Sequence, residues 1–237
     1  MHIMKENVNS DKRVTLSELD LPGDLKNLTI NQCSYLCNEI RNILISTVSK
    51  TGGHLASNLG SVELTMALHR NFDSPNDKIV WDVGHQAYTH KILTGRADRF
   101  STLRQEGGIS GFPKPCESEH DSFISGHSST SVSVACGIAE AMKLQGRDNY
   151  AVAVIGDGAM TGGMFYEAMN NCGRGGVNNI IVILNDNDMS ISKSVGALSG
   201  YLTSLRNTEK YANTKRAIHR GLDKIPFGNS IEKGIKD

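Results

Sequence analysis

The sequence predicts an α/β fold in which a parallel sheet is covered by helices on both faces. Two runs are apolar at nearly every position, residues 150–155 and 180–184, as expected for strands buried on both faces. Helical patterns separate these runs, and parallel strands need such crossover connections. The 237 residues are enough for one large domain with a sizeable core.

The individual elements follow from apolar spacing and from glycine and proline. Leu36, Ile40 and Leu44 share one helical stripe, and Gly52-Gly53 is a typical helix end. A long segment rich in glycine, proline and charge predicts a loop, and loops of this length are often functional. The expected elements are helices over 29–50, 61–72, 129–144 and 162–171, strands over 78–82, 150–155 and 180–184, and a loop over 96–125.

The chain is expected to have one domain and a short N-terminal arm. Residues 1–28 are polar and charged, and we expect them to form the arm, with residues 29–237 forming the domain. The basic residues that follow Arg206 are interpreted as a solvated helix face.

Composition excludes several functional classes. Lys plus Arg and Asp plus Glu each number 25, so the formal net charge is zero, and aromatic residues make up only 5%. A nucleic-acid binder would normally show a basic excess or stacking aromatics. There is no apolar run near the ~18 residues of a membrane span, and no secretory signal. The five cysteines form no CxxC pair, which favours reduced, packed thiols and a cytoplasmic protein.

Polar residues follow two of the predicted strands at their carboxyl ends. Gly156-Asp157-Gly158 follows the strand over 150–155, and Asn185-Asp186-Asn187-Asp188-Met189 follows the strand over 180–184. If these strands are parallel, both clusters emerge at the edge of the sheet where ligands bind in such folds. Carboxylate, amide and carbonyl oxygens suit Mg²⁺, and glycines let a phosphate approach backbone N–H groups. Neither common nucleotide-binding fingerprint is present.

This composite resembles the thiamine diphosphate signature, and four further segments narrow the resemblance. Residues 52–60, 81–88, 126–131 and 189–192 follow the order and spacing found in 1-deoxy-D-xylulose-5-phosphate synthases, relatives of transketolase. The sequence motif Asp-Val-Gly-His-Gln-Ala-Tyr within 81–88 differs from the corresponding motif of transketolase itself. The resemblance implies a transketolase-like thiamine diphosphate-binding fold. It also implies a homodimeric enzyme that converts pyruvate and glyceraldehyde 3-phosphate to 1-deoxy-D-xylulose 5-phosphate and CO₂. The sugar phosphate product is a precursor of isoprenoids, thiamine and pyridoxal.

The resemblance also implies roles for individual residues. It implies a magnesium site made by Asp157, Asn187 and the Met189 carbonyl, a cofactor site lined by His85, Gly126, His127, Ser128, Gly158, Ala159 and Asn187, and catalytic histidines at His54 and His85. A neutral imidazole can move protons near pH 7, which suits such a reaction. His69, His120 and His219 are interpreted as structural or exposed.

Members of this family are far longer than 237 residues, and their later domains carry the glutamate that activates the cofactor. No residue here matches it, and Glu63 and Glu167 lie on predicted helices and are expected to serve structure. We therefore expect a C-terminally truncated first domain that is inactive alone. The expected partner is a second copy in a homodimer or a complementary chain that carries the later domains. The alternatives are the N-terminal subunit of a split transketolase and a non-catalytic remnant.

Overall fold

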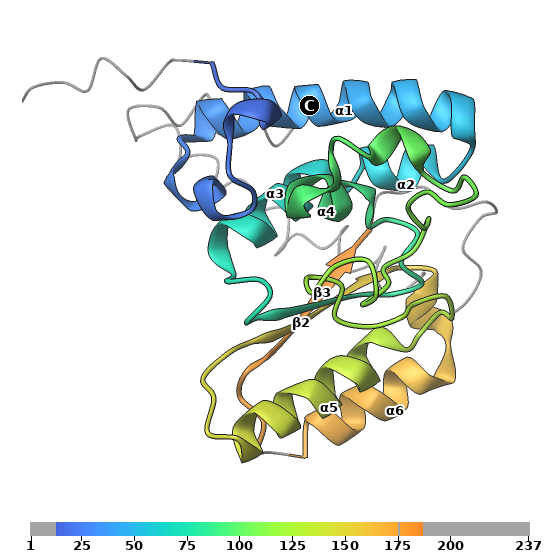
Figure 1. Ribbon diagram of the computed structural model, residues 1–237. Coiled ribbons are helices and arrows are strands. Elements are labelled where there is room, and N and C mark those ends of the chain that lie inside the picture. The colour runs from blue at the N-terminus through green and yellow to red at the C-terminus, as the bar shows by residue number, and fades with distance from the viewer. Residues whose placement is uncertain (1–12, 175, 187–237) are drawn as a thin grey trace, which may run out of the picture. The chain divides into compact units, whose positions relative to one another are not determined.

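A parallel sheet of three strands separates helices on its two faces (Figure 1). The computed structural model describes residues 13–174 and 176–186. The strands lie in the order β1 (Lys78–Trp81), β2 (Ala151–Gly156) and β3 (Ile180–Asn185), and both neighbouring pairs are parallel. The predicted fold class is confirmed.

Side chains of the strands alternate between two apolar clusters, one on each face of the sheet. Helices α5 (Ser131–Leu144) and α6 (Gly163–Cys172) cover the face that carries Val80, Ala153 and Ile155. Helix α3 (Val62–Asn71) supplies Leu64 and Leu68 to the other face, where they pack with Ile79, Trp81, Val152 and Val154. Because β1 and β2 are buried on both faces, they are apolar at nearly every position rather than alternating. The expectation of a buried strand over 180–184 is wrong for β3, which is only half-buried and exposes Leu184, since among the described residues it has a neighbouring strand on one side only.

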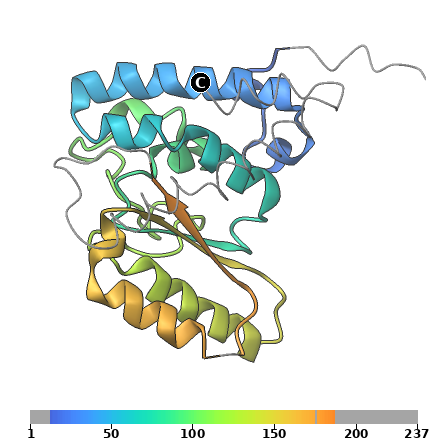
Figure 2. The same cartoon turned by 180° about the vertical axis from the view of Figure 1, so that it is seen from behind.

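Helix α1 (Ile30–Thr51) is the outermost element on the α3 side of the sheet, as both views show (Figure 2). It begins with a reciprocal capping box, in which Thr29 and Gln32 each bond the other's backbone N–H. The predicted stripe of Leu36, Ile40 and Leu44 is fully buried against the elements beneath it. Each strand and helix predicted within the described residues is confirmed to within two residues of its expected ends. The helix face expected after Arg206 lies outside the described residues.

The elements not predicted are the shortest ones. Helices α2 (Leu55–Leu59) and α4 (Tyr88–Lys91) have 5 and 4 residues, too few for apolar periodicity to show. A π-helical turn, η3 (Ile92–Arg96), continues α4, and the expected long loop follows with one short 3₁₀ turn, η4 (Phe100–Thr102). A further 3₁₀ turn, η5 (Ala159–Thr161), precedes α6.

The described part of the expected arm packs onto the helical layer. It contains two 3₁₀ turns, η1 (Leu16–Glu18) and η2 (Gly23–Asn27), and the buried side chains of Leu16, Leu25 and Leu28 join the α1 cluster. The thiols of Cys33 and Cys37 are free and buried on α1, and burial raises the pKa of the Cys37 thiol to about 12. Among the described residues, no helix has the length and apolar character needed to cross a membrane.

Candidate active site

Two histidines from separate segments lie side by side at one end of the sheet. His54 directly precedes α2 and His85 follows β1, and their ring centroids are 5.4 Å apart. The buried Asn58 donates from Nδ2 to the carbonyl of His54 at 2.6 Å and to that of His85 at 2.7 Å. Its Oδ1 accepts the backbone N–H of Tyr88 at 2.9 Å. One buried amide thus fixes the spacing of the two predicted catalytic residues.

The long loop closes over Gly84, the residue next to His85. Gly84 has φ +85°, and a Cβ there would lie 2.6 Å from Pro113 Cδ and 2.9 Å from Ser125 Cβ. The Ser125 hydroxyl donates to the Trp81 carbonyl at 2.9 Å, which ties the loop to the end of β1. Only glycine meets both the backbone and the space requirement at this position.

We expect Gly84→Ala to lower the free energy of unfolding by about 3 kcal/mol, from ~1 kcal/mol of left-handed backbone strain and ~2 kcal/mol of overpacking. Urea unfolding measures this loss. Gly107→Ala is the matched control, because Gly107 has φ +70° but open space around a Cβ. It should lose only the backbone part, about 1 kcal/mol. Equal losses in the two variants would show that the loop does not press on Gly84.

The next segment of the site is held by a buried carboxylate that sequence reasoning missed. Asp82 is 1% exposed and accepts the N–H of Ser129 at 2.8 Å and that of Ser131, the first residue of α5, at 2.9 Å. A carboxylate at a helix N-terminus is electrostatically favourable. Val83 and Ser129 both have positive φ, 59° and 68°, and strain of this kind concentrates at functional sites.

The carboxyl ends of β2 and β3 bring further predicted residues to the same edge. Gly156 pairs with Asn185 in register, so Asp157 and Asp186 are the next residues along their neighbouring strands. The Asn185 side chain donates to Gln86 Oε1 at 2.8 Å, which links the end of β3 to the His85 segment. The expected metal ligands Asn187 and Met189 lie outside the described residues.

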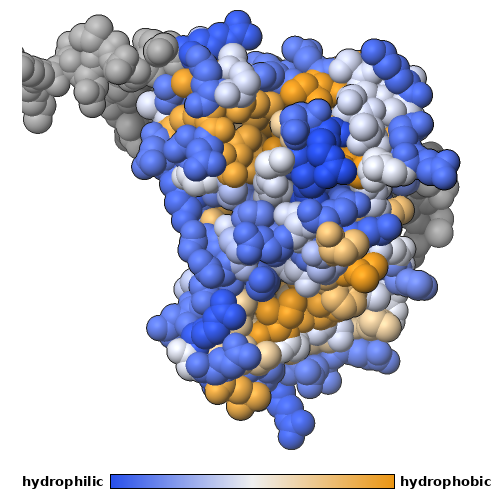
Figure 3. Space-filling model, in the orientation of Figure 1, coloured by the Kyte–Doolittle hydropathy of each residue, from blue (hydrophilic) through white to orange (hydrophobic). Residues whose placement is uncertain are grey.

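A hydrogen bond links Ser129, the residue after the predicted cofactor-binding segment 126–128, to the predicted segment 158–159. The Ser129 hydroxyl donates to the Ala159 carbonyl at 2.6 Å. Gly126, His127 and Ser128 are exposed, and a Cβ at Gly126 or Gly158 would meet nothing within 4 Å. An open pocket of about 300 Å³ beside them is lined by Gly126, His127, Phe123, Ile124, Thr130, Ser133, Val134 and Met164. In the view of Figure 3, apolar side chains gather over α5, in the lower half of the picture.

Both histidines of the pair have lowered basicity. Partial burial, and then the positive charge of Arg104, lowers the pKa of His54. Burial lowers the pKa of His85, and the neighbouring His54 adds to this, while the Asp82 carboxylate opposes it. Both rings are therefore neutral at pH 7, the form in which an imidazole has one donor and one acceptor nitrogen.

Comparison with known proteins identifies the family. The model of the 1-deoxy-D-xylulose-5-phosphate synthase family matches residues 16–237 of this chain. The chain belongs to the 1-deoxy-D-xylulose-5-phosphate synthase family. The synthase of Syntrophomonas wolfei is 59% identical over 211 residues, which are 89% of this chain and 33% of that protein. The synthase of Alkaliphilus oremlandii is 59% identical over 220 residues, 92% of this chain and 35% of that protein.

Solved structures of transketolases share the fold of this synthase-family chain. Transketolase from Pichia stipitis matches with a TM-score of 0.59 and 21% identity, over 70% of this chain and 29% of that one. Transketolase from Leishmania mexicana matches with a TM-score of 0.57 and 21% identity, over 70% and 30%. The transketolase-like fold is thus confirmed. The chain spans about a third of the length of the synthases it matches.

The residues at the sheet edge fit the cofactor and metal expected for the synthase family. Nδ1 of His85 and the hydroxyl of Ser131 are buried with no hydrogen-bond partner among the described residues. The Asp157 carboxylate is a hard oxygen donor of the kind Mg²⁺ binds, and the space beside Gly158 is open. Residues 13–174 and 176–186 contain no group of three His, Cys, Asp or Glu that could hold a metal.

A buried charged cluster behind the histidine pair was not predicted at all. Its cations, Lys91 and Arg96, lie 25 or 26 residues from its carboxylates, Glu117 and Asp121, so no local pattern in the sequence marks the cluster. Lys91 Nζ lies 2.7 Å from Glu117, and Arg96 binds both oxygens of Asp121 at 2.7 and 2.8 Å. Two cations thus meet two carboxylates in the interior of this synthase-family domain, which satisfies the requirement that buried charges be paired.

Two neutral histidines complete the cluster. His90 Nε2 lies 3.1 Å from Asp121 Oδ1, and His90 Nδ1 lies 2.8 Å from His69 Nε2. Because the four charges balance, His90 donates from Nε2 as a neutral ring and accepts from His69, whose Nδ1 is buried without a partner among the described residues. His69 and His120, which bonds Ser74 at 2.9 Å, therefore serve structure as predicted; His219 lies outside the described residues.

We expect this cluster to make the domain sensitive to acid. Burial lowers the pKa of His69 and of His90. Below about pH 6.5 these rings therefore bind protons in the unfolded chain but stay neutral in the folded chain, which favours unfolding. Burial alone would raise the pKa of Asp121, but hydrogen bonds from Arg96 and His90 outweigh it and hold that pKa well below its usual range. The Asp121 contribution is therefore complete above about pH 4 and is lost as the pH falls further.

Urea unfolding at a series of pH values between 8 and 4 measures how the free energy of unfolding depends on pH. Stability should be level from pH 8 to 7 and should then fall by up to about 1.4 kcal/mol per pH unit for each buried histidine. His69→Gln keeps an N–H for His90 but cannot titrate, so its slope between pH 6.5 and 5 should be smaller. An unchanged slope in that variant would contradict the assignment of the titrating group.

Proposed function

We propose that this chain forms the thiamine diphosphate- and Mg²⁺-binding part of a 1-deoxy-D-xylulose-5-phosphate synthase. The complete enzyme would join pyruvate to glyceraldehyde 3-phosphate, release CO₂ and supply precursors of isoprenoids, thiamine and pyridoxal. We expect it to act in the cytoplasm, as a homodimer or with a complementary chain that carries the later domains.

The observation that carries this proposal is the meeting of the histidine pair and the Asp157 carboxylate at one edge of the sheet. His54 and His85 are 5.4 Å apart beyond β1, and the link from Asn185 to Gln86 joins their segment to the strand that neighbours Asp157. Ligands of open α/β sheets bind at this edge.

The diphosphate and metal would be held by residues that follow β2 and β3. Asp157, Asn187 and the Met189 carbonyl would hold Mg²⁺, and Gly158 and Ala159 would contact the diphosphate. Gly126, His127 and Ser128 would also line the cofactor site, which the hydrogen bond between Ser129 and Ala159 supports by holding the two segments together. Small residues at these positions leave room for phosphate oxygens near backbone N–H groups.

When bound, thiamine diphosphate supplies the electron sink for cleaving the bond between the carbonyl and carboxylate carbons of pyruvate. The chain's own part is to orient the reactants and manage protons. His85 offers to a bound molecule a buried Nδ1 that has no partner among the residues the structure describes. The neutral ring of His54 beside it can accept or donate a proton at pH 7.

Turnover assays test this proposal. The 237-residue chain with thiamine diphosphate, Mg²⁺, pyruvate and glyceraldehyde 3-phosphate should bind cofactor but give no sustained product. Addition of the remaining two thirds of the Syntrophomonas wolfei synthase, expressed separately, should give 1-deoxy-D-xylulose 5-phosphate. Product from the chain alone would contradict the assigned partial role. Activity of the mixture on a ketose phosphate donor in place of pyruvate would instead favour a split transketolase.

A further inference from the structure

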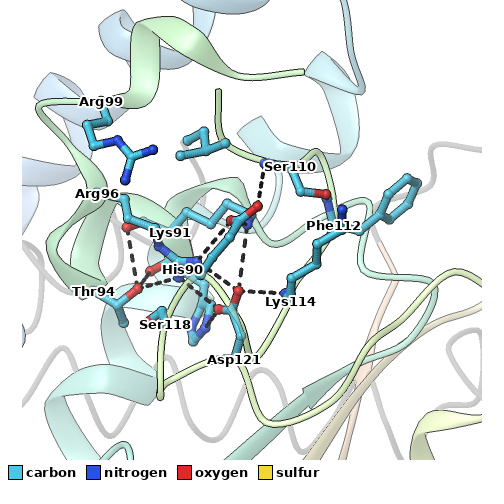
Figure 4. Close-up of polar contacts among 12 residues, drawn as sticks. His90, Lys91, Thr94, Arg96, Arg99, Ser110, Phe112, Lys114, Ser118 and Asp121 are labelled. Carbon is cyan, nitrogen blue, oxygen red and sulfur yellow. Dashed lines mark hydrogen bonds and ion pairs between the residues drawn. The ribbon is translucent and has the colours of Figure 1, made fainter. Parts of the chain in front are cut away.

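Two carboxylates hold the tip of the long loop by its own backbone. Glu117 Oε1 accepts the N–H of Ser110 at 2.7 Å, and Asp121 Oδ2 accepts the N–H of Lys114 at 2.7 Å. Both anchors come from the later half of the loop, so residues 110–114 form a tip that is fixed at each end. Figure 4 shows the bond from the Lys114 backbone N–H to Asp121, with the Phe112 side chain pointing away from the charged cluster.

The same two carboxylates are bound to the buried cations of α4 and η3. Glu117 Oε2 accepts from Lys91 at 2.7 Å, and the Asp121 carboxylate forms a two-point pair with Arg96. The side chains of Lys91 and Asp121 are 0% exposed, and that of Arg96 is 6% exposed. Charges so deeply buried keep one geometry, because leaving it would strand an unpaired charge. The loop tip is therefore locked to the rigid helical segment beneath it.

The residues between the two anchors lie against His54 and against Gly84, the residue before His85. The Phe112 ring lies 6.4 Å from the His54 ring at 61°, an edge-to-face contact. A Cβ at Gly84, the residue immediately before His85, would lie 2.6 Å from Pro113 Cδ, so Pro113 packs closely over this backbone. The locked tip thus reaches His54 through one residue and the His85 segment through the next.

We infer that Glu117 and Asp121 are positioning residues, which set the placement of His54 and His85 through the loop tip at Phe112 and Pro113. The inference rests on the function proposed above, since it assigns these carboxylates to the support of the same site. It gives the buried cluster a role beyond loop stability, because the tip that the cluster anchors contacts His54 and lies close to Gly84, the residue before His85.

Proton NMR titration of the histidine ring signals in the unliganded 237-residue chain tests this inference without any need for cofactor. The signals can be assigned with His54→Gln and His85→Gln. Glu117→Gln and Asp121→Asn each keep one acceptor oxygen where the carboxylate uses two, so the link between the buried cation and the loop tip is broken. Phe112 should then move away from His54, and the midpoint of His54 should rise toward the ordinary value near ~6.5. Glu117 is 18% exposed at the side chain, so Glu117→Gln is the milder change and serves if Asp121→Asn does not fold.

Two controls separate positioning from general stability. Glu119→Gln removes the same charge from an exposed position on the same loop and should leave both midpoints unchanged. Ala139→Gly weakens α5 on the opposite face of the sheet, so it should lower stability and again leave both midpoints unchanged. A folded Glu117→Gln chain with the wild-type His54 and His85 midpoints overturns the inference, as does an equal shift in Ala139→Gly.

Calorimetric titration with thiamine diphosphate and Mg²⁺ then distinguishes this inference from the proposed function. If the wild-type chain binds, Glu117→Gln should weaken binding by about 10-fold, the usual effect of losing a supporting partner. If the wild-type chain does not bind, the proposed function fails, while the NMR result still decides the positioning role. Wild-type affinity in a Glu117→Gln chain would overturn the inference even where the NMR midpoints move.

Discussion

Asp157→Ala is expected to abolish the Mg²⁺-dependent binding of thiamine diphosphate. Asp157 directly follows β2 at the carboxyl edge of the sheet, and it is the one carboxylate in the expected ligand set. A divalent cation between a diphosphate and the protein needs at least one negatively charged protein ligand to offset its lost hydration. Calorimetry should show affinity weakened by at least about 100-fold, which corresponds to ~2.7 kcal/mol.

The matched control for this change is Glu167→Ala. Glu167 is an exposed carboxylate on α6, so the same charge is removed without loss of a ligand. It should retain wild-type affinity, and both variants should retain the wild-type unfolding midpoint. Equal affinity in the Asp157→Ala and wild-type chains would place the metal elsewhere.

Asp82→Ala is expected to cause the largest stability loss of any single change at the site. It would strand the buried N–H groups of Ser129 and Ser131, each at a cost of about 1–3 kcal/mol, and would remove the charge that stabilises the start of α5. We expect a fall of about 3–4 kcal/mol in the free energy of unfolding. Ser129 would also leave its strained conformation, so the segment 126–128 would lose its position.

Two further variants sharpen this prediction. Asp82→Asn keeps one acceptor oxygen, so it should lose roughly half as much stability as Asp82→Ala and remains measurable if the alanine variant does not fold. Asp98→Ala removes an exposed aspartate that accepts only the N–H of the next residue among the bonds described, and should cost under ~0.5 kcal/mol. Similar losses for Asp82→Ala and Asp98→Ala would show that the buried carboxylate does not hold α5.

Local sequence pattern predicts those features of this molecule that depend on neighbours in the chain. The strands and long helices follow from apolar spacing, and the meeting of Asp157 with the end of β3 follows from parallel strands. The role of Asp82 did not follow, because its partner Ser129 is 47 residues away. The pair of Arg96 and Asp121 likewise spans 25 residues, and a charge buried by distant contacts has no periodic signature.

The family resemblance added what local pattern could not, namely the pairing of His54 with His85. These residues are 31 apart in the chain, yet Asn58 bonds both carbonyls and holds the two rings together. Their catalytic role, like the metal-binding role of Asn187 and Met189, stays a prediction.

A crystal structure of the chain grown with thiamine diphosphate and Mn²⁺ in place of Mg²⁺ tests the central claim most directly. Mn²⁺ accepts the same oxygen ligands and can be located by its anomalous signal. The account predicts an anomalous peak within coordination distance of the Asp157 carboxylate, with the diphosphate beside Gly158 and the cofactor reaching toward His85. A cofactor-loaded crystal with the metal bound away from Asp157, or with the diphosphate on another edge of the sheet, would contradict it.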